Sequence, residues 1–199
     1  MKMKKGILLM LCAIMSIQLN AQELSEADNA AIDQQVGVFL DLMENKSYTK
    51  TLDLIYPKFF EHSNKKDMFQ VFELLEKSGI ELKFENLEVL EKTRLPAEGS
   101  ISYALIKYSL NMELPLNTDE LKSYSAFIVP MLQENFGKEN VEHNRTESYV
   151  KVQGEKFLIG VSDPAYEDWM FLIYDDSFMT AINKTIPANV SKEAAARTN

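Results

Sequence analysis

The residue best suited to acid–base chemistry is His62, which closes the run Phe59-Phe60-Glu61-His62. An imidazole that is neutral near pH 7 can accept or donate a proton, and the Glu61 carboxylate could tune it. Tyr56 and Tyr108 could complete such a site, because a tyrosine hydroxyl in an enclosed pocket can polarise a carbonyl. We assign no catalytic residue outright, and these three are the candidates for a cofactor-free isomerase or dehydratase. The alternative for His62 is a solvated residue at the end of a helix.

Large side chains on the expected elements supply a second set of candidates, for contact with a bound ligand. Aromatic and methionine side chains offer large apolar surfaces, and tyrosine hydroxyls add a polar end. The alternative is that they are ordinary core residues, because aromatic residues are enriched in strands. The pocket candidates are Tyr56, Phe59, Tyr103, Tyr108, Met112 and Trp169.

Motifs for metal, nucleotide or nucleophile chemistry are missing from the sequence. It has no Gly-rich phosphate loop, no Gly-x-Ser-x-Gly elbow and no His-Glu-x-x-His helix. The second histidine, His143, is 81 residues from His62, lacks a close histidine or cysteine partner, and lies in a polar run predicted to be a loop. Asp163, Glu167 and Asp168 could hold a weak calcium ion, as could Asp175-Asp176, and the respective alternatives are a solvated turn and the start of a helix. We therefore expect no metal and no cofactor.

The first 21 residues have the pattern of a cleavable export signal. A basic start is followed by an apolar run from Gly6 to Leu19, and the small residue Ala21 precedes Gln22. The run has about 14 residues, whereas a helix that spans a bilayer needs about 20. The pattern predicts cleavage between Ala21 and Gln22, release to the periplasm or the cell exterior, and no stable membrane insertion afterwards.

Cleavage would change the chemistry of the chain. Cys12 is the only cysteine, and its place in the middle of the segment, after Leu11, argues against a lipoprotein. The mature chain would then have no thiol and no disulfide. The loss of three lysines would move the net charge from −9 to −12, and an acidic body repels nucleic acid and anionic lipid headgroups. Apolar residues at 46% predict a folded globule.

The spacing of apolar residues predicts helices at the start of the mature chain and strands later. The helices are expected over residues 25–45, 49–61, 65–77, 118–136 and 175–186. Pro57 should kink the second helix or set a new first turn, and Pro130 should kink or divide the fourth. The strands are expected over residues 80–89, with a bulge near Glu85-Asn86, and over 100–114, 146–153, 156–162 and 168–174. Gln153-Gly154 and Asp163-Pro164 read as turns. Residues 187–199 form either a short helix or a frayed tail.

This order predicts an α+β fold, and three stretches resemble the NTF2-like superfamily. The stretches are Leu54–Phe60, Asn135–Val141 and Trp169–Leu172. The resemblance is to uncharacterised exported members from Bacteroidetes-type bacteria. It implies N-terminal helices in the concavity of a strongly curved antiparallel sheet, an extra helix between strands and a C-terminal helix. It also implies one domain over residues 22–190, between the signal (1–21) and a tail (191–199).

The superfamily contains isomerases, dehydratases, transport factors and binding modules, so the fold does not select a function. Our preferred hypothesis is an exported, non-catalytic module that binds a small apolar or amphipathic molecule, or a protein partner. The second hypothesis is a cofactor-free enzyme in which His62 or a carboxylate inside the fold acts as the base and Tyr56 or Tyr108 polarises a carbonyl. The third is an assembly protein that pairs through its sheet. One face of the expected sheet is polar, which argues against a large apolar dimer interface, so we expect a monomer or a weak homodimer. The polar residues are Lys107, Ser109, Asn111 and Glu113.

Overall fold

The computed structural model describes residues 23–77 and 82–198, and within them the chain is α+β. The expected cleavage point, Ala21-Gln22, lies outside the described residues, as does Ile80 at the start of the first expected strand. In the part that is described, no helix is long and apolar enough to cross a membrane.

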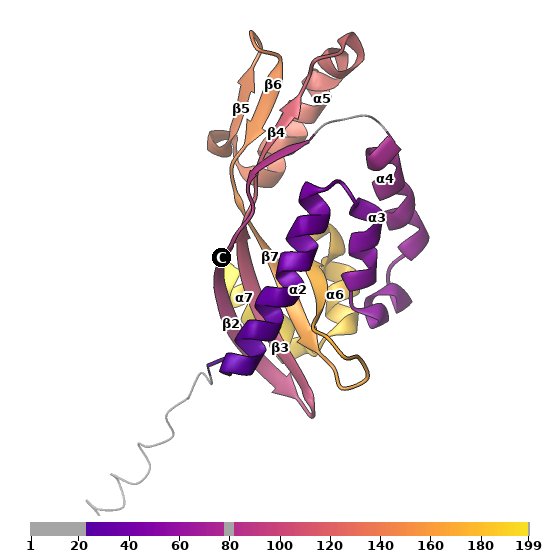
Figure 1. Cartoon of the computed structure of the whole chain (residues 1–199), viewed down its shortest axis with the longest axis vertical. Coiled ribbons are helices and arrows are strands. Elements are labelled where there is room, and N and C mark those ends of the chain that lie inside the picture. The colour runs from indigo at the N-terminus through magenta and orange to yellow at the C-terminus, as the bar shows by residue number, and fades with distance from the viewer. Residues whose placement is uncertain (1–22, 78–81, 199) are drawn as a thin grey trace, which may run out of the picture.

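Helices and strands alternate in blocks along the chain (Figure 1). The helical elements are α2 (Glu26–Glu44), α3 (Tyr48–Thr51), η1 (Leu52–Leu54), η2 (Pro57–Glu61), α4 (Lys65–Lys77), α5 (Asp119–Phe136), η3 (Lys138–Asn140), η4 (Asp176–Phe178), α6 (Met179–Thr185) and α7 (Ala188–Thr198). The strands are β1 (Lys83–Asn86), β2 (Val89–Glu98), β3 (Ile101–Ser109), β4 (Asn111–Pro115), β5 (Val141–Asn144), β6 (Tyr149–Val152), β7 (Glu155–Ser162) and β8 (Met170–Tyr174).

Among the described residues the strands form two four-stranded antiparallel sheets, ordered β1-β4-β6-β5 and β2-β3-β7-β8. The two sheets join without a break in register. Ser109 pairs with Glu155 and Met112 pairs with Val152. The chain therefore moves on by the same number of residues from β3 to β4 as from β6 to β7, and the register is unchanged. There the Leu110 amide donates a 2.8 Å hydrogen bond to the carbonyl of Gly154. Gln153-Gly154 is therefore an in-line joint, and its prediction as a turn was wrong.

Two features of the predicted elements are settled by backbone geometry. The bulge expected near Glu85-Asn86 is confirmed by a register shift between Phe84 and Asn86. The helix expected over 49–61 is divided at Pro57, which begins η2 as the predicted new first turn. The division falls there because the residue before a proline, here Tyr56, avoids the helical conformation. The chain is extended there, and the Tyr56 amide donates a 2.9 Å hydrogen bond to the carbonyl of Phe171.

Helices cover both faces of the β2-β3-β7-β8 sheet. Successive strand residues point to opposite faces, so Ala104 and Ile106 contact α2 while Tyr103 and Leu105 contact α6 and α7. The α2 core contains Ile32, Val36, Phe39, Leu40, Ala104, Ile106, Tyr108, Leu158, Trp169 and Phe171. The α7 core contains Leu52, Ile55, Tyr56, Phe59, Leu95, Tyr103, Leu105, Ile159, Val161, Leu172, Ala181, Ile182, Ile186, Val190 and Ala194.

The last residues of the chain are part of this packing. Of the two alternatives for residues 187–199, the structure has the helix, α7, and the side chains of Val190 and Ala194 are fully buried in the α7 core. The residues expected to form a tail after 190 are therefore packed against the sheet up to Thr198.

The second sheet and α5 form a separate tier, at the top of Figure 1. Its apolar cluster, the α5 core, consists of Leu114, Leu116, Leu132, Val141, Val150 and Val152. α5 begins after Thr118, the first residue of the expected range, whose hydroxyl accepts a 3.1 Å hydrogen bond from the Leu121 amide and caps the helix. The helix continues to Phe136 with Pro130 inside it, so Pro130 does not divide it. β5, which covers His143, was not predicted.

Candidate functional site

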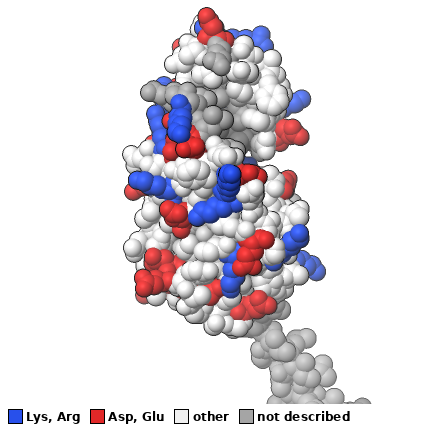
Figure 2. Space-filling view, turned by 90° about the vertical axis from the view of Figure 1, so that its right-hand side faces the viewer, with Lys and Arg blue, Asp and Glu red and all other residues white. Residues whose placement is uncertain are grey.

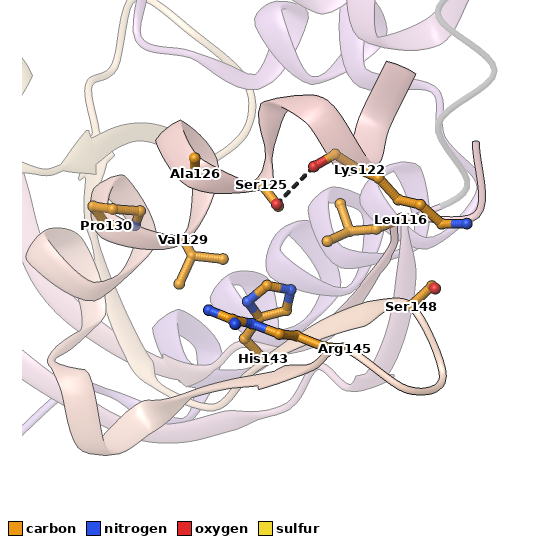
Figure 3. A pocket seen from close by; sticks show the side chains of 9 residues that line it. All are labelled: Leu116, Lys122, Ser125, Ala126, Val129, Pro130, His143, Arg145 and Ser148. Atoms are coloured by element: carbon orange, nitrogen blue, oxygen red, sulfur yellow. Dashed lines mark hydrogen bonds between the residues drawn. The ribbon is translucent and has the colours of Figure 1, made fainter. Parts of the chain in front are cut away.

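A hollow of about 610 Å³ lies between α5 and the β5–β6 hairpin (Figure 3). This volume is in the range of small-molecule sites. We call the hollow the α5 groove, and its lining residues are Leu116, Lys122, Ser125, Ala126, Val129, Pro130, His143, Arg145 and Ser148.

α5 supplies one wall of the groove because its sequence has two adjacent stripes. Leu121, Ile128 and Leu132 recur at helical spacing and pack into the α5 core. The groove wall is a neighbouring stripe, again with steps of three and four residues, formed by Lys122, Ser125, Ala126, Val129 and Pro130. A search for a single apolar stripe finds the first set and misses the second.

The β5–β6 hairpin supplies the opposite wall. His143 pairs with Val150 in the ladder, and its side chain is half-buried. Asn144 then closes the turn, because its side-chain oxygen accepts hydrogen bonds from the amides of Thr146 at 3.1 Å and Glu147 at 3.0 Å. This turn carries Arg145, whose guanidinium lies alongside the His143 ring in Figure 3. His143 was predicted to be a loop residue and is instead on a strand.

The charge of the groove is opposite in sign to that of the chain. Three basic or imidazole side chains line it, from Lys122, His143 and Arg145, and none of the nine lining residues is acidic. The nearest carboxylate partner of Lys122 is Asp119, at 4.0 Å. The chain as a whole has a net charge of −9, and on the face seen in Figure 2 acidic and basic side chains are interspersed.

The structure does not bring the three catalytic candidates together. His62 is exposed at the end of η2. Tyr56 is buried in the α7 core, whereas Tyr108 is buried in the α2 core, with its ring edge-on to Phe39 at 6.4 Å between centroids. The two tyrosines therefore lie on opposite faces of one sheet.

The remaining pocket candidates also lie in the interior. Phe59 and Tyr103 share the α7 core with Tyr56, Trp169 is in the α2 core, and Met112 packs against the α5 core. None of them is among the residues that line the α5 groove. Contact between these residues and a ligand stays a prediction.

Asp163 is buried at the start of the predicted turn, whose other acidic residues, Glu167 and Asp168, are exposed. Only 7% of Asp163 is exposed, and its carboxylate accepts hydrogen bonds from the Ala165 amide, the Tyr56 hydroxyl and the Lys58 ammonium. These bonds lower the pKa of Asp163 to about 2, while burial and the bond to Asp163 raise the pKa of Tyr56 to about 12. The described residues contain no group of three or more His, Cys, Asp or Glu that could hold a metal ion.

Two further hollows lie near the joint between the sheets, with volumes of about 700 and 790 Å³. They share Asn135, Glu155, Phe157 and Thr198, and their walls are predominantly polar. The α5 groove differs in having mostly apolar walls with a few polar groups, the usual make-up of a small-molecule site.

Comparison with models of protein families, with curated proteins and with solved structures gives no match.

Proposed function

We propose that this protein is a non-catalytic binding module and that its ligand is a small amphipathic molecule held in the α5 groove. The observation that carries the proposal is the make-up of the groove. Leu116, Val129 and Pro130 present apolar surface within the same hollow of about 610 Å³ that holds His143 and Arg145. A ligand with one apolar part and one polar part uses both kinds of wall.

The surroundings of His143 favour binding over catalysis. A catalytic imidazole is normally oriented by a second group and placed within reach of a nucleophile. Within the described part of the chain, no side-chain hydrogen bond or ion pair orients the His143 ring. Ser125, the hydroxyl on the facing wall, already donates a 2.7 Å hydrogen bond to the carbonyl of Lys122.

We further propose that the module is exported and related to the NTF2-like superfamily. The N-terminal segment supports export by its pattern. A long bent antiparallel sheet with α2 against one face supports the relationship. Pairing through the opposite face of the β2-β3-β7-β8 sheet is disfavoured, because α6 and α7 cover Tyr103 and Leu105 there.

Two neighbouring substitutions in α5 test the proposal. Ala126 lines the groove and Phe127, which is 71% exposed, does not. Ala126→Gln adds bulk to the groove wall with a good helix former, and Phe127→Gln is the matched control. We expect isothermal titration with decanol to give saturable binding that Ala126→Gln weakens and Phe127→Gln leaves unchanged. Equal effects of the two substitutions would contradict the assignment of the groove.

A second candidate function is docking of a protein through the outer side of α5. Tyr124, Phe127 and Met131 are 53%, 71% and 42% exposed, and they follow one another at intervals of three and four residues. Such a stripe is typical of a helix that meets a partner. Light scattering over a concentration series tests self-association as one form of it. A mass that stays monomeric in the wild type and in Phe127→Glu would remove a second copy as the partner.

A further inference from the structure

We propose that the ligand of the α5 groove is an amphipathic monocarboxylate, with its carboxylate between Arg145 and His143 and its apolar chain along α5. This inference rests on the proposed function, because it names the chemistry of the ligand for the same groove. Four observations carry it, and they concern charge balance, the state of the turn amides, the shape of the donors and the apolar wall.

The first observation is a contrast in charge balance between the two sides of one sheet. On the side away from α5, basic residues are neutralised across the strands, Lys83 by Glu113 at 2.8 Å and Lys151 by Glu85 at 2.6 Å. In the groove, Arg145 and His143 both line the hollow (Figure 3), and neither makes an ion pair with a described residue. A guanidinium and an imidazole that line one hollow without a carboxylate among the lining residues favour an anion.

The second observation concerns the backbone amides of the hairpin turn. A phosphate group is commonly held by several consecutive free amides. Here the amides of Thr146 and Glu147 are already used, because both donate to the side-chain oxygen of Asn144. Neither of these two amides is available to a ligand, which favours a carboxylate over a phosphate.

The third observation is the geometry of those side chains. A guanidinium is planar and presents paired N–H groups that match the two oxygens of a carboxylate. Arg145 approaches from the hairpin turn and His143 from β5, so that both lie toward the α5 wall in Figure 3. Lys122 also lines the groove and adds a positive charge to it.

The fourth observation is the apolar wall that continues from this point. Ala126 and Pro130 are exposed in the groove although their side chains are apolar, and Val129 is half-buried between them. An alkyl chain laid along these three residues would remove apolar surface from water, which is favourable in proportion to the area covered. The groove thus presents an anion-binding end followed by an apolar track.

The test is titration calorimetry of the full chain with four probes that share a ten-carbon chain: decanoate, decanol, decyltrimethylammonium and decyl phosphate. We expect decanoate to bind about tenfold more tightly than decanol, as one charge-assisted hydrogen bond would give. Arg145→Ala should weaken decanoate binding about tenfold and leave decanol unchanged. Lys192→Ala removes the same charge from an exposed position on α7 and should change neither.

The outcomes separate the two proposals. If none of the four probes binds, the proposed function itself fails. If decanol binds as tightly as decanoate, or Arg145→Ala has no more effect than Lys192→Ala, the proposal of a carboxylate ligand is wrong. The proposed function as a binding module would be unaffected by that result. Tighter binding of decyltrimethylammonium would overturn it as well. Decyl phosphate binding about tenfold more tightly than decanoate would overturn the choice of a carboxylate.

Discussion

The hydroxyl of Tyr56 donates a 2.7 Å hydrogen bond to Oδ2 of Asp163, and it joins residues that are 107 positions apart in the sequence. The Lys58 ammonium reaches the same oxygen at 2.9 Å, and the Ala165 amide donates to Oδ1 at 3.0 Å. Tyr56 and Lys58 flank the start of η2, whereas Asp163 follows β7. This cluster links the start of η2 to the turn that follows β7.

Tyr56→Phe should destabilise the fold. The substitution removes a buried hydrogen bond to a charged acceptor, which is worth about 1.5–3 kcal/mol. Chemical denaturation in urea measures the loss of unfolding free energy. Tyr124→Phe on the exposed side of α5 is the matched control, because its side chain is in solvent. A loss in Tyr56→Phe no larger than in the control would show that Asp163 is held adequately by Lys58 and Ala165.

Asp163 should also give the fold a specific sensitivity to acid. Its pKa is about 2 in the folded chain and 3.8 at its ordinary value. A carboxyl group whose pKa is lowered by folding stabilises the fold above the ordinary pKa, and this contribution is lost as the pH falls through the folded pKa. The loss should therefore fall between about pH 4 and pH 2, and should amount to something on the order of 2 kcal/mol.

Asp163→Asn isolates this effect because it cannot ionise. We expect the difference in unfolding free energy between the wild type and Asp163→Asn to be constant from pH 7 to about pH 5 and to shrink below about pH 4. Urea titrations at a series of pH values give this difference directly. A difference that does not change with pH would mean that Asp163 ionises in the folded chain as it does in the unfolded one.

Two glycines should respond to alanine in opposite directions. A methyl group on Gly160 would lie 3.1 Å from Ile106 and 3.1 Å from the Trp169 ring, so Gly160→Ala should destabilise by about 1–3 kcal/mol through overpacking. Gly37 is in the middle of α2 with nothing within 4 Å of the added methyl. Gly37→Ala should stabilise by about 0.5–1 kcal/mol. Thermal unfolding compares the two, and a stabilised Gly160→Ala would contradict the packing of Trp169 on β7.

α7 should behave as an integral part of the domain. Val190 is fully buried and Asn189 next to it is exposed. Val190→Asp places an unpaired charge in the α7 core and should prevent cooperative folding, because the charge has no partner there. Asn189→Asp should have little effect. Near-ultraviolet circular dichroism distinguishes the two, and a native spectrum for Val190→Asp would show that α7 is dispensable.

The parts of the fold that were predictable have strong local signals. Alternation of apolar and polar residues located the long strands, and a change in that alternation located the bulge before Asn86, because both depend on the pleat of a single strand. The signals failed where a distant contact decides the outcome. Gly154 reads as a turn residue, yet it continues a strand because Leu110 pairs with it and the ring of Phe136 lies where a side chain would be.

The candidate site was harder to predict than the fold. His143 was recognised as titratable, but β5 is four residues long and too short to give a periodic pattern. Arg145 and Lys122 have no sequence pattern that marks a site, since only the packing of α5 on the hairpin places them in one groove. Tyr56 was a candidate for catalysis, but its hydroxyl instead donates a hydrogen bond to Asp163. No local pattern could predict this bond, because the two residues are 107 positions apart in the sequence.

The proposed ligand site lies beside α5 and not among the tyrosines inside the fold. Amide chemical-shift mapping of the full chain during a titration with decanoate locates the bound ligand. We predict that the largest shifts occur at Ala126, Val129, His143 and Arg145. Shifts concentrated instead at Tyr56, Tyr103, Tyr108 and Trp169, with α5 unaffected, would contradict this account and place the ligand in the interior.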